Sequence, residues 1–212
     1  MKIKIAIADD HPLVITGLRH ILGNCADMEI TGSYINGAEL LAAMAVGQPD
    51  VLLLDIQLPG QTGDELAEII KEKYPDVKIL VLTNFDNVFY VKNMLKKGAN
   101  GYVLKTTNED ILLEAIKSVF EGKLYLEPVL REKVLLDNLQ AKRPFTTAPV
   151  ITRMEKEVLQ LIAADMTSQQ IAEKLLLSKR TIDNYRLSLL MKLGVKNPAG
   201  LIKKAIQLGL ID

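Results

Sequence analysis

The segment Ile3-Lys4-Ile5-Ala6-Ile7-Ala8-Asp9-Asp10-His11-Pro12 decides the fold, because an apolar run ends there in two adjacent carboxylates and a proline. The run has the length and composition of a buried strand, and Pro12 suits the first turn of a helix. Four more apolar runs follow, at residues 28–32, 51–54, 78–82 and 101–104. Stretches with helical periodicity alternate with the runs, at residues 12–22, 38–46, 65–73, 88–97 and 108–121. This alternation predicts an α/β fold with a doubly wound, five-stranded parallel sheet.

The second part of the chain has a different pattern. Residues 123–147 carry Pro128 and Pro144 and one amphipathic stretch at 129–139, so we interpret them as a linker that contains a helix. From residue 148 onward the periodicity is helical throughout. Four short helices with a tight turn between the second and third are typical of a helix-turn-helix domain. The sequence therefore predicts an α/β domain at 1–122, the linker at 123–147 and a small all-α domain at 148–212.

The composition is that of an ordinary globular protein, with 49% hydrophobic and 25% charged residues among 212, which excludes a disordered chain. The formal net charge of zero conceals a division. Residues 1–147 contain 16 Lys and Arg against 20 Asp and Glu, whereas residues 148–212 contain 10 against 6, which suggests a polyanionic partner for the basic part. No apolar stretch reaches the roughly 18 residues of a membrane span. The single cysteine, Cys25, and the lack of a secretory leader favour a cytoplasmic protein.

Polar side chains follow four of the expected strands where each strand ends. Asp9 and Asp10 follow the first, Asp55 the third, Thr83 the fourth and Lys105 the fifth. Because the carboxyl ends of parallel strands meet at one edge of a sheet, these groups should converge. Clustered carboxylates repel one another, and Mg²⁺, which prefers oxygen ligands, would relieve that repulsion. A carboxylate can also attack phosphorus to give an acyl phosphate, with the ammonium and the metal neutralising the transferred group.

These motifs resemble the receiver domain of two-component response regulators over residues 1–122. The motifs that carry the resemblance lie at residues 7–12, 54–60, 81–83 and 101–105. The resemblance implies a flavodoxin-like fold and a phosphoryl group accepted on Asp55 from a sensor histidine kinase. It also implies that Asp9, Asp10, Asp55 and the backbone carbonyl of Gln57 hold Mg²⁺.

The same resemblance implies a switch. In this resemblance the Thr83 hydroxyl moves toward the phosphoryl group, and Lys105 supplies its counter-charge. Tyr102 is the aromatic side chain that changes position in response. An aromatic side chain in a short strand is also consistent with plain packing. Many receivers have a proline after the lysine, with a cis peptide bond. Thr106 follows Lys105 here, which predicts a trans bond. His11 and His20 have no cysteine partners and are assigned no role.

Residues 148–212 resemble the LuxR-type helix-turn-helix, on motifs at residues 151–159, 170–175, 178–182 and 192–195. With the receiver, they give the chain the layout of a NarL/FixJ-type response regulator, which implies double-stranded promoter DNA as the partner. Met154 and Asp165 depart from the family pattern, which usually has Arg and Gly at these places. Since the domain has no dense basic run, one copy should bind weakly. A homodimer is therefore expected when the protein is phosphorylated or bound to DNA.

A helical wheel on residues 179–193 assigns one stripe of the recognition helix to the core of the domain. The core stripe consists of Ile182, Tyr185, Leu189 and Leu193. The opposite face should enter the major groove; it is centred on Arg180, Asn184, Leu187, Ser188 and Met191.

Chemistry assigns partners to the residues of this reading face. Arg180 suits guanine and Asn184 suits adenine, since each side chain can form two parallel hydrogen bonds to that base. Asp183 could accept from cytosine, and Leu187 could contact a thymine methyl group. Basic residues on the flanks suit phosphate contacts; these are Lys179, Arg186 and Lys192.

Three functions compete. The first is a phosphorylation-controlled DNA-binding transcription regulator. Such a protein is not an enzyme, and its only chemistry is its own phosphorylation and dephosphorylation at Asp55. The second is a self-acting acyl-phosphatase, although the sequence shows no separate substrate cleft. The third is a phospho-signalling adaptor that acts through protein contacts without reading DNA, an alternative that Met154, Asp165 and Asp183 keep open. A mobility-shift experiment with and without a phosphodonor distinguishes the three.

Overall fold

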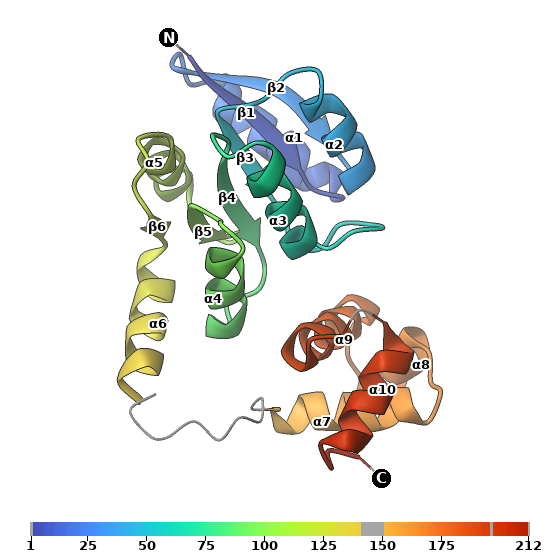
Figure 1. Ribbon diagram of the computed structural model, residues 1–212. Coiled ribbons are helices and arrows are strands. Elements are labelled where there is room, and N and C mark those ends of the chain that lie inside the picture. Colours follow the sequence, from blue (N-terminus) through green and yellow to red (C-terminus); the bar gives the residue numbers. More distant parts are fainter. Residues whose placement is uncertain (1, 141–150, 196, 212) are drawn as a thin grey trace. The chain divides into compact units, whose positions relative to one another are not determined.

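The computed structural model describes residues 2–140, 151–195 and 197–211 (Figure 1). The chain forms two compact units, residues 1–142 and 143–212, and each is described by itself. The end of the predicted linker, with Pro144, lies outside the described residues, as does the side chain of Arg180.

The first unit contains a parallel sheet with the strand order β2-β1-β3-β4-β5-β6. The strands are β1 (Ile3–Ala8), β2 (Met28–Tyr34), β3 (Val51–Leu54), β4 (Lys78–Thr83), β5 (Gly101–Leu104) and β6 (Tyr125–Leu126). The predicted parallel α/β fold is thereby confirmed. The strand order reverses at β1, which pairs with β2 on one side and β3 on the other. In open α/β sheets, ligands bind at the carboxyl ends of the strands where the order reverses, here β1 and β3.

The prediction of five strands is wrong by one, because the structure adds β6 beside β5. The Tyr125 amide donates to the Asn100 carbonyl at 3.1 Å, and the Glu127 amide donates to the Tyr102 carbonyl at 3.1 Å. A strand of two residues is too short to leave a periodic signal in the sequence. Part of the segment expected to be a linker therefore belongs to the first unit.

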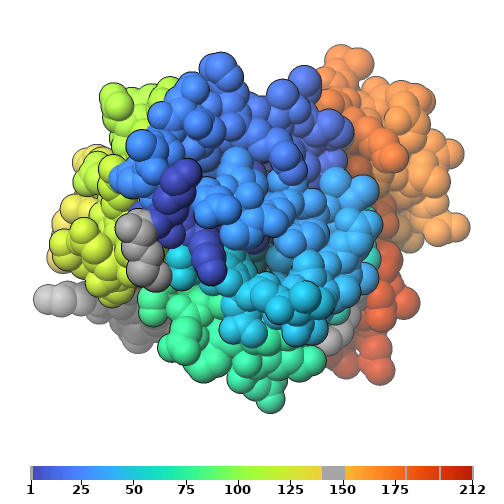
Figure 2. All heavy atoms as spheres, turned by 90° about the horizontal axis from the view of Figure 1, so that it is seen from above, coloured from blue at the N-terminus to red at the C-terminus, as the bar shows by residue number. Residues whose placement is uncertain are grey.

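In the described part of the first unit, six helices accompany this sheet: α1 (Pro12–Gly23), α2 (Gly37–Met44), α3 (Gly63–Lys73), α4 (Val88–Lys96), α5 (Glu109–Phe120) and α6 (Pro128–Gln140). Leu18 and Leu22 of α1 share one apolar cluster with Leu112 and Ile116 of α5, so these two helices cover the same face of the sheet. Figure 2 looks onto the amino-terminal edge of this unit, with the start of β1 in dark blue.

The second unit consists of α7 (Arg153–Ala163), α8 (Ser168–Leu175), α9 (Lys179–Leu193) and α10 (Pro198–Gln207). A capping box opens α7, since the Thr152 hydroxyl accepts from the Glu155 amide while the Glu155 carboxylate accepts from the Thr152 amide. All four helices contribute to one apolar cluster around Leu159, Ile171 and Leu201. The four-helix prediction is confirmed.

Among the described residues of this unit, two residues other than glycine adopt left-handed backbone conformations. Asp165 has φ +58° and Leu176 has φ +55°, a region that favours glycine. Asp165 thus occupies the conformation that suits the Gly usual at this place in the family. Among the described residues no peptide bond is cis, so the Lys105–Thr106 bond is trans as predicted. Within the same residues, no helix combines the length and apolar character needed to cross a membrane.

Candidate functional site

The acidic pocket lies at the carboxyl edge of the sheet. Asp9 and Asp55 follow β1 and β3, and these strands pair in register with Ala8 opposite Leu54, so the two carboxylates become neighbours. Only 2% of Asp9 and 3% of Asp55 is exposed to solvent. The sheet therefore places two buried carboxylates side by side, as the spacing of the sequence motifs predicts.

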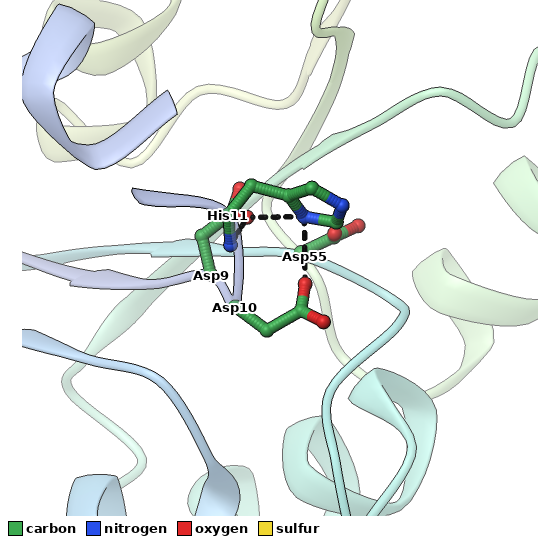
Figure 3. Close-up of side chains that lie close together, drawn as sticks. All are labelled: Asp9, Asp10, His11 and Asp55. Carbon is green, nitrogen blue, oxygen red and sulfur yellow. Dashed lines mark hydrogen bonds and ion pairs between the residues drawn. The ribbon is translucent and has the colours of Figure 1, made fainter. Parts of the chain in front are cut away.

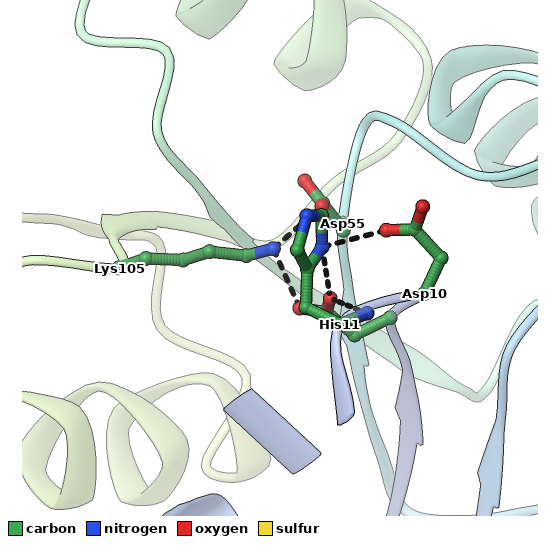
Figure 4. Close-up of polar contacts among 5 residues, drawn as sticks. Asp10, His11, Asp55 and Lys105 are labelled. Carbon is green, nitrogen blue, oxygen red and sulfur yellow. Dashed lines mark hydrogen bonds and ion pairs between the residues drawn. The ribbon is translucent and has the colours of Figure 1, made fainter. Parts of the chain in front are cut away.

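Lys105 joins these acids from the end of β5 (Figure 4). Its Nζ lies 2.6 Å from Oδ2 of Asp9 and 2.6 Å from Oδ2 of Asp55. The lysine side chain is only 6% exposed, so its ammonium compensates two buried carboxylates in a site with little water. Burial raises the pKa of Asp55, an effect that the Lys105 ammonium opposes and the Asp9 carboxylate reinforces.

His11 also belongs to the pocket, although the sequence assigns it no role (Figure 3). Its Nδ1 lies 3.0 Å from Oδ1 of Asp9 and 2.6 Å from Oδ1 of Asp10, and its amide donates to Oδ1 of Asp9 at 2.9 Å. The position directly after two acids is the signal in the sequence that would have found it. Nδ1 of His11 thus contacts both carboxylates.

The donor set fits a hard divalent cation. One ligand atom from each of Asp9, Asp10, His11 and Asp55 lies within 4.8 Å of the others. Three carboxylates at such separations suit Mg²⁺, which completes its shell with water and phosphate oxygens. Gln57 lies two residues beyond Asp55, in the loop before α3, and is partly buried.

Thr83 ends β4 beside this cluster and is 1% exposed. Its hydroxyl is buried and makes no regular hydrogen bond within the described residues, although it lies close enough to Asp55 to help lower the pKa of that carboxyl. A buried hydroxyl that lacks a well-formed hydrogen bond costs free energy. A new acceptor on Asp55 would therefore gain a donor that is already in place.

Tyr102 on β5 is fully buried, and its hydroxyl donates to the carbonyl of Phe85 at 2.8 Å. Phe85 lies in the loop between β4 and α4, two residues after Thr83. The Phe85 ring stacks on Tyr90 of α4 with ring centroids 4.3 Å apart. Burial raises the pKa of Tyr102 well above its ordinary value, so the hydroxyl remains a donor. Tyr102 thus holds the loop that follows Thr83.

In the second unit, α9 presents its predicted stripe to the core. Ile182 and Leu189 are fully buried, Leu193 is 5% exposed, and Tyr185 packs against the same cluster. The stripe assigned from the helical wheel is confirmed.

The other residues of α9 that are predicted to contact DNA differ in their exposure to solvent. Lys179 is exposed, and Asp183, Asn184, Arg186 and Leu187 are partly exposed. The amide oxygen of Asn184 is buried and accepts no hydrogen bond within the described residues. The structure tests none of these residues as DNA contacts.

The buried position of Lys192 contradicts the prediction that this residue contacts a DNA phosphate. Its Nζ donates to Oε2 of Glu155 on α7 at 2.7 Å, and the two side chains are 6% and 4% exposed. Ser188, expected on the reading face, is also buried and donates to Oε1 of Glu155 at 2.6 Å. The physical reason is proximity to the core stripe: at about 100° per residue, Lys192 lies only about 60° from Leu189.

Glu155 is the centre of this contact. Its carboxylate accepts from the Lys192 ammonium, the Ser188 hydroxyl and the Thr152 amide. Burial by itself raises the pKa of Glu155, but the hydrogen bonds from Lys192 and Ser188 outweigh it and hold that pKa below its ordinary value. The sequence pattern does not reveal Glu155 as an ion-pair partner, because Lys192 lies 37 residues away along the chain.

Comparisons with known proteins agree with this architecture. Residues 5–117 match the family model of the response regulator receiver domain. Residues 149–205 match that of bacterial regulatory proteins of the luxR family. The oxygen regulatory protein NreC of Staphylococcus carnosus is 34% identical, covering 99% of both chains.

Solved structures of the response regulator RcsB resemble the whole chain. RcsB as two dimers bound to two parallel DNAs is 27% identical, with a TM-score of 0.61 and 100% of both chains covered. RcsB of Salmonella enterica serovar Typhimurium, bound to promoter P1flhDC in the presence of the phosphomimetic BeF₃⁻, is 28% identical. That match has a TM-score of 0.62 and covers 98% of this chain and 100% of the other.

Proposed function

Because this chain belongs to the response regulators with a LuxR-type DNA-binding domain, we propose that it accepts a phosphoryl group on Asp55 from a sensor histidine kinase. The chain is a phosphorylation-controlled DNA-binding transcription regulator. Its only covalent chemistry would take place on its own carboxylate, and its place of action would be the cytoplasm. The observation that carries the proposal is the contact of Lys105 with both Asp9 and Asp55, at 2.6 Å each.

The chemistry follows from the pocket. An Asp55 oxygen attacks the phosphorus of a phosphohistidine, the P–N bond breaks, and an acyl phosphate forms. Lys105, already hydrogen-bonded to Asp55, would then face the new phosphoryl oxygens. Asp9, Asp10, Asp55 and the carbonyl of Gln57 would hold Mg²⁺, which supplies positive charge for the transferred group.

The switch would begin at Thr83. Its buried hydroxyl would donate to a phosphoryl oxygen, and this movement would shift the loop whose Phe85 carbonyl accepts from Tyr102. Tyr102 would change its position in response. A promoter-binding homodimer would result, as RcsB has been solved in the form of dimers on DNA.

We assign residues 1–122 to the receiver, 123–147 to the connecting segment and 148–212 to the DNA-binding domain. Lys179 and Arg186 remain the proposed phosphate contacts, and Asp183, Asn184 and Leu187 the proposed base contacts. Arg180 is proposed as a base contact from its sequence position alone.

Mass spectrometry tests the acceptor. Incubating the full chain with acetyl phosphate and Mg²⁺ should add one phosphoryl group, and Asp55→Asn should abolish the adduct. Asp10→Asn and excess chelator should each slow its formation, because both remove the metal from the pocket. An adduct that persists in Asp55→Asn would show that another residue is the acceptor.

The loss of Lys192 as a phosphate contact favours one alternative, a phospho-signalling adaptor that does not read DNA. The acid Asp183 on the proposed reading face points the same way, because it repels phosphate. Mobility shifts on genomic fragments, with and without acetyl phosphate, decide between the two. A regulator should bind selected fragments more tightly when phosphorylated, whereas an adaptor should show no fragment preference.

A further inference from the structure

Helix α6 packs on α4 through one face. Leu130 is fully buried, and the two helices contact each other directly. At one end of the contact, Nζ of Lys133 lies 2.6 Å from Oδ2 of Asp86 and 3.4 Å from its carbonyl oxygen. At the other end, Nζ of Lys92 donates to Asp137 at 2.6 Å and to Asn138 at 2.7 Å. The segment after the fifth helix is therefore docked on the first unit, although the sequence suggests a linker.

Glu127, directly before α6, makes a second attachment. Its carboxylate accepts from the Leu104 amide at 2.7 Å, and the residue is only 8% exposed. Leu104 is the last residue of β5 and immediately precedes Lys105. The carboxylate thus fixes the strand end that carries the pocket lysine.

The two attachments contact the two chain segments that carry the proposed phosphoryl-sensing groups. Asp86 lies three residues after Thr83, in the loop that Tyr102 holds through the Phe85 carbonyl. Leu104 adjoins Lys105. A phosphoryl group on Asp55 that draws Thr83 and Lys105 toward it would move the neighbouring backbone. Both attachments of α6, at Asp86 and at Leu104, lie on that backbone.

The docking is suited to reversal. Lys133 and Asp86 are 41% and 63% exposed, and Lys92 and Asp137 are 41% and 53% exposed, so each ion pair contributes little. The outward face of α6 is apolar and uncovered within the described residues; its large side chains are Val129, Leu135, Leu136 and Leu139, each at least half exposed. Within the described part of the first unit, the contacts of α6 therefore lie on one side of the helix.

We propose that Glu127 and Lys133 are positioning residues that couple the phosphorylation pocket to α6, so that α6 docks less tightly when Asp55 carries a phosphoryl group. The coupling rests on the proposed function of Asp55. Along the chain, α6 precedes the helices of the DNA-binding domain, which begin at α7.

Thermodynamic reciprocity provides a sharp test. Suppose that the phosphoryl group lowers the equilibrium constant for docking of α6 by some factor. A variant in which α6 docks less tightly must then bind a phosphoryl mimic more tightly, by at most the same factor. The probe is BeF₃⁻ with Mg²⁺, measured by ¹⁹F NMR on the full chain, together with hydrogen exchange of the α6 amides. The variants are Lys133→Asp, Asp86→Lys and the swapped double variant. Glu132→Lys, an exposed position on the same helix, is the control for a charge change.

BeF₃⁻ should accelerate exchange of the α6 amides in the wild-type chain. Lys133→Asp and Asp86→Lys should each accelerate it about two- to fivefold without BeF₃⁻ and tighten BeF₃⁻ binding by a similar factor, the size expected for one exposed ion pair. The swapped double variant should return both quantities to wild-type values, which a merely structural loss would not do. Glu127→Gln, which keeps an acceptor for the Leu104 amide, should affect both less than Glu127→Leu.

Two results would overturn the coupling. One is α6 exchange that does not respond to bound BeF₃⁻, and the other is equal BeF₃⁻ affinity in all variants. Failure of the proposed function is distinguishable: the Asp55→Asn chain would then bind BeF₃⁻ as well as the wild type, or neither chain would bind it. In that case the coupling fails with the proposal on which it rests.

Discussion

Lys192 of α9 and Glu155 of α7 form a buried ion pair at 2.7 Å, with both side chains almost inaccessible to solvent. A buried charge that loses its partner is costly, whereas a well-matched pair is tolerated. The pair therefore joins the recognition helix to the helix that opens the domain. Its loss should affect stability rather than phosphate binding.

Lys192→Ala should destabilise the second unit by about 3–5 kcal/mol, because it leaves the Glu155 carboxylate buried and uncompensated. Thermal unfolding followed by circular dichroism measures the loss. Well below the unfolding temperature, the dependence of log K on log salt should stay as in the wild type. Lys179→Ala is the matched control. It should leave stability unchanged and reduce the salt slope by about 0.9, as the loss of one phosphate contact does. A reduced slope in Lys192→Ala would restore it as a phosphate contact.

The same pair predicts a pH dependence. The folded-state pKa of Glu155 is lowered from its ordinary value of 4.5, so the unfolded chain binds its proton more readily. The contribution of Glu155 to stability is therefore fully present above pH 4.5 and is lost as the pH falls through the lowered pKa. Glu155→Gln imitates the protonated form. Unfolding temperatures of the wild type and Glu155→Gln should differ at pH 7 and converge in acid, and a constant difference would contradict this.

The sequence predicts the fold and most of the pocket because those features are local. Asp9, Asp55 and Lys105 each follow an apolar run, and parallel strands bring their ends together whatever the helices contain. The roles of His11 and Glu127 are not predicted from the sequence. Their roles depend on side-chain directions and on a two-residue strand, neither of which produces a periodic signal. The prediction for Lys192 is wrong because a residue at the border of a helical stripe can face either the core or the solvent.

Leu176 predicts a gain in stability. It directly follows the last residue of α8, has φ +55° and a side chain that is 93% exposed, so the side chain adds strain and little packing. Leu176→Gly should stabilise the second unit by about 1 kcal/mol. Leu176→Ala keeps the Cβ atom and hence the strain, so it should give no gain. Chemical denaturation of the three proteins measures the difference, and equal stability of the Gly and Ala variants would refute the strain argument.

Substitution of Thr83 should separate phosphorylation of Asp55 from the gain in DNA affinity. Thr83→Ala removes the buried hydroxyl without touching Asp55 or Lys105, so the variant should still acquire one phosphoryl group from acetyl phosphate. It should lose most of the gain in DNA affinity, because no donor then pulls the loop held by Tyr102. Thr83→Ser retains a hydroxyl and should keep most of the gain. DNA affinity and sedimentation, each with and without phosphodonor, measure the effect. Equal gains in wild type and Thr83→Ala would refute the route through Thr83 and Tyr102 and leave Asp55 as the acceptor.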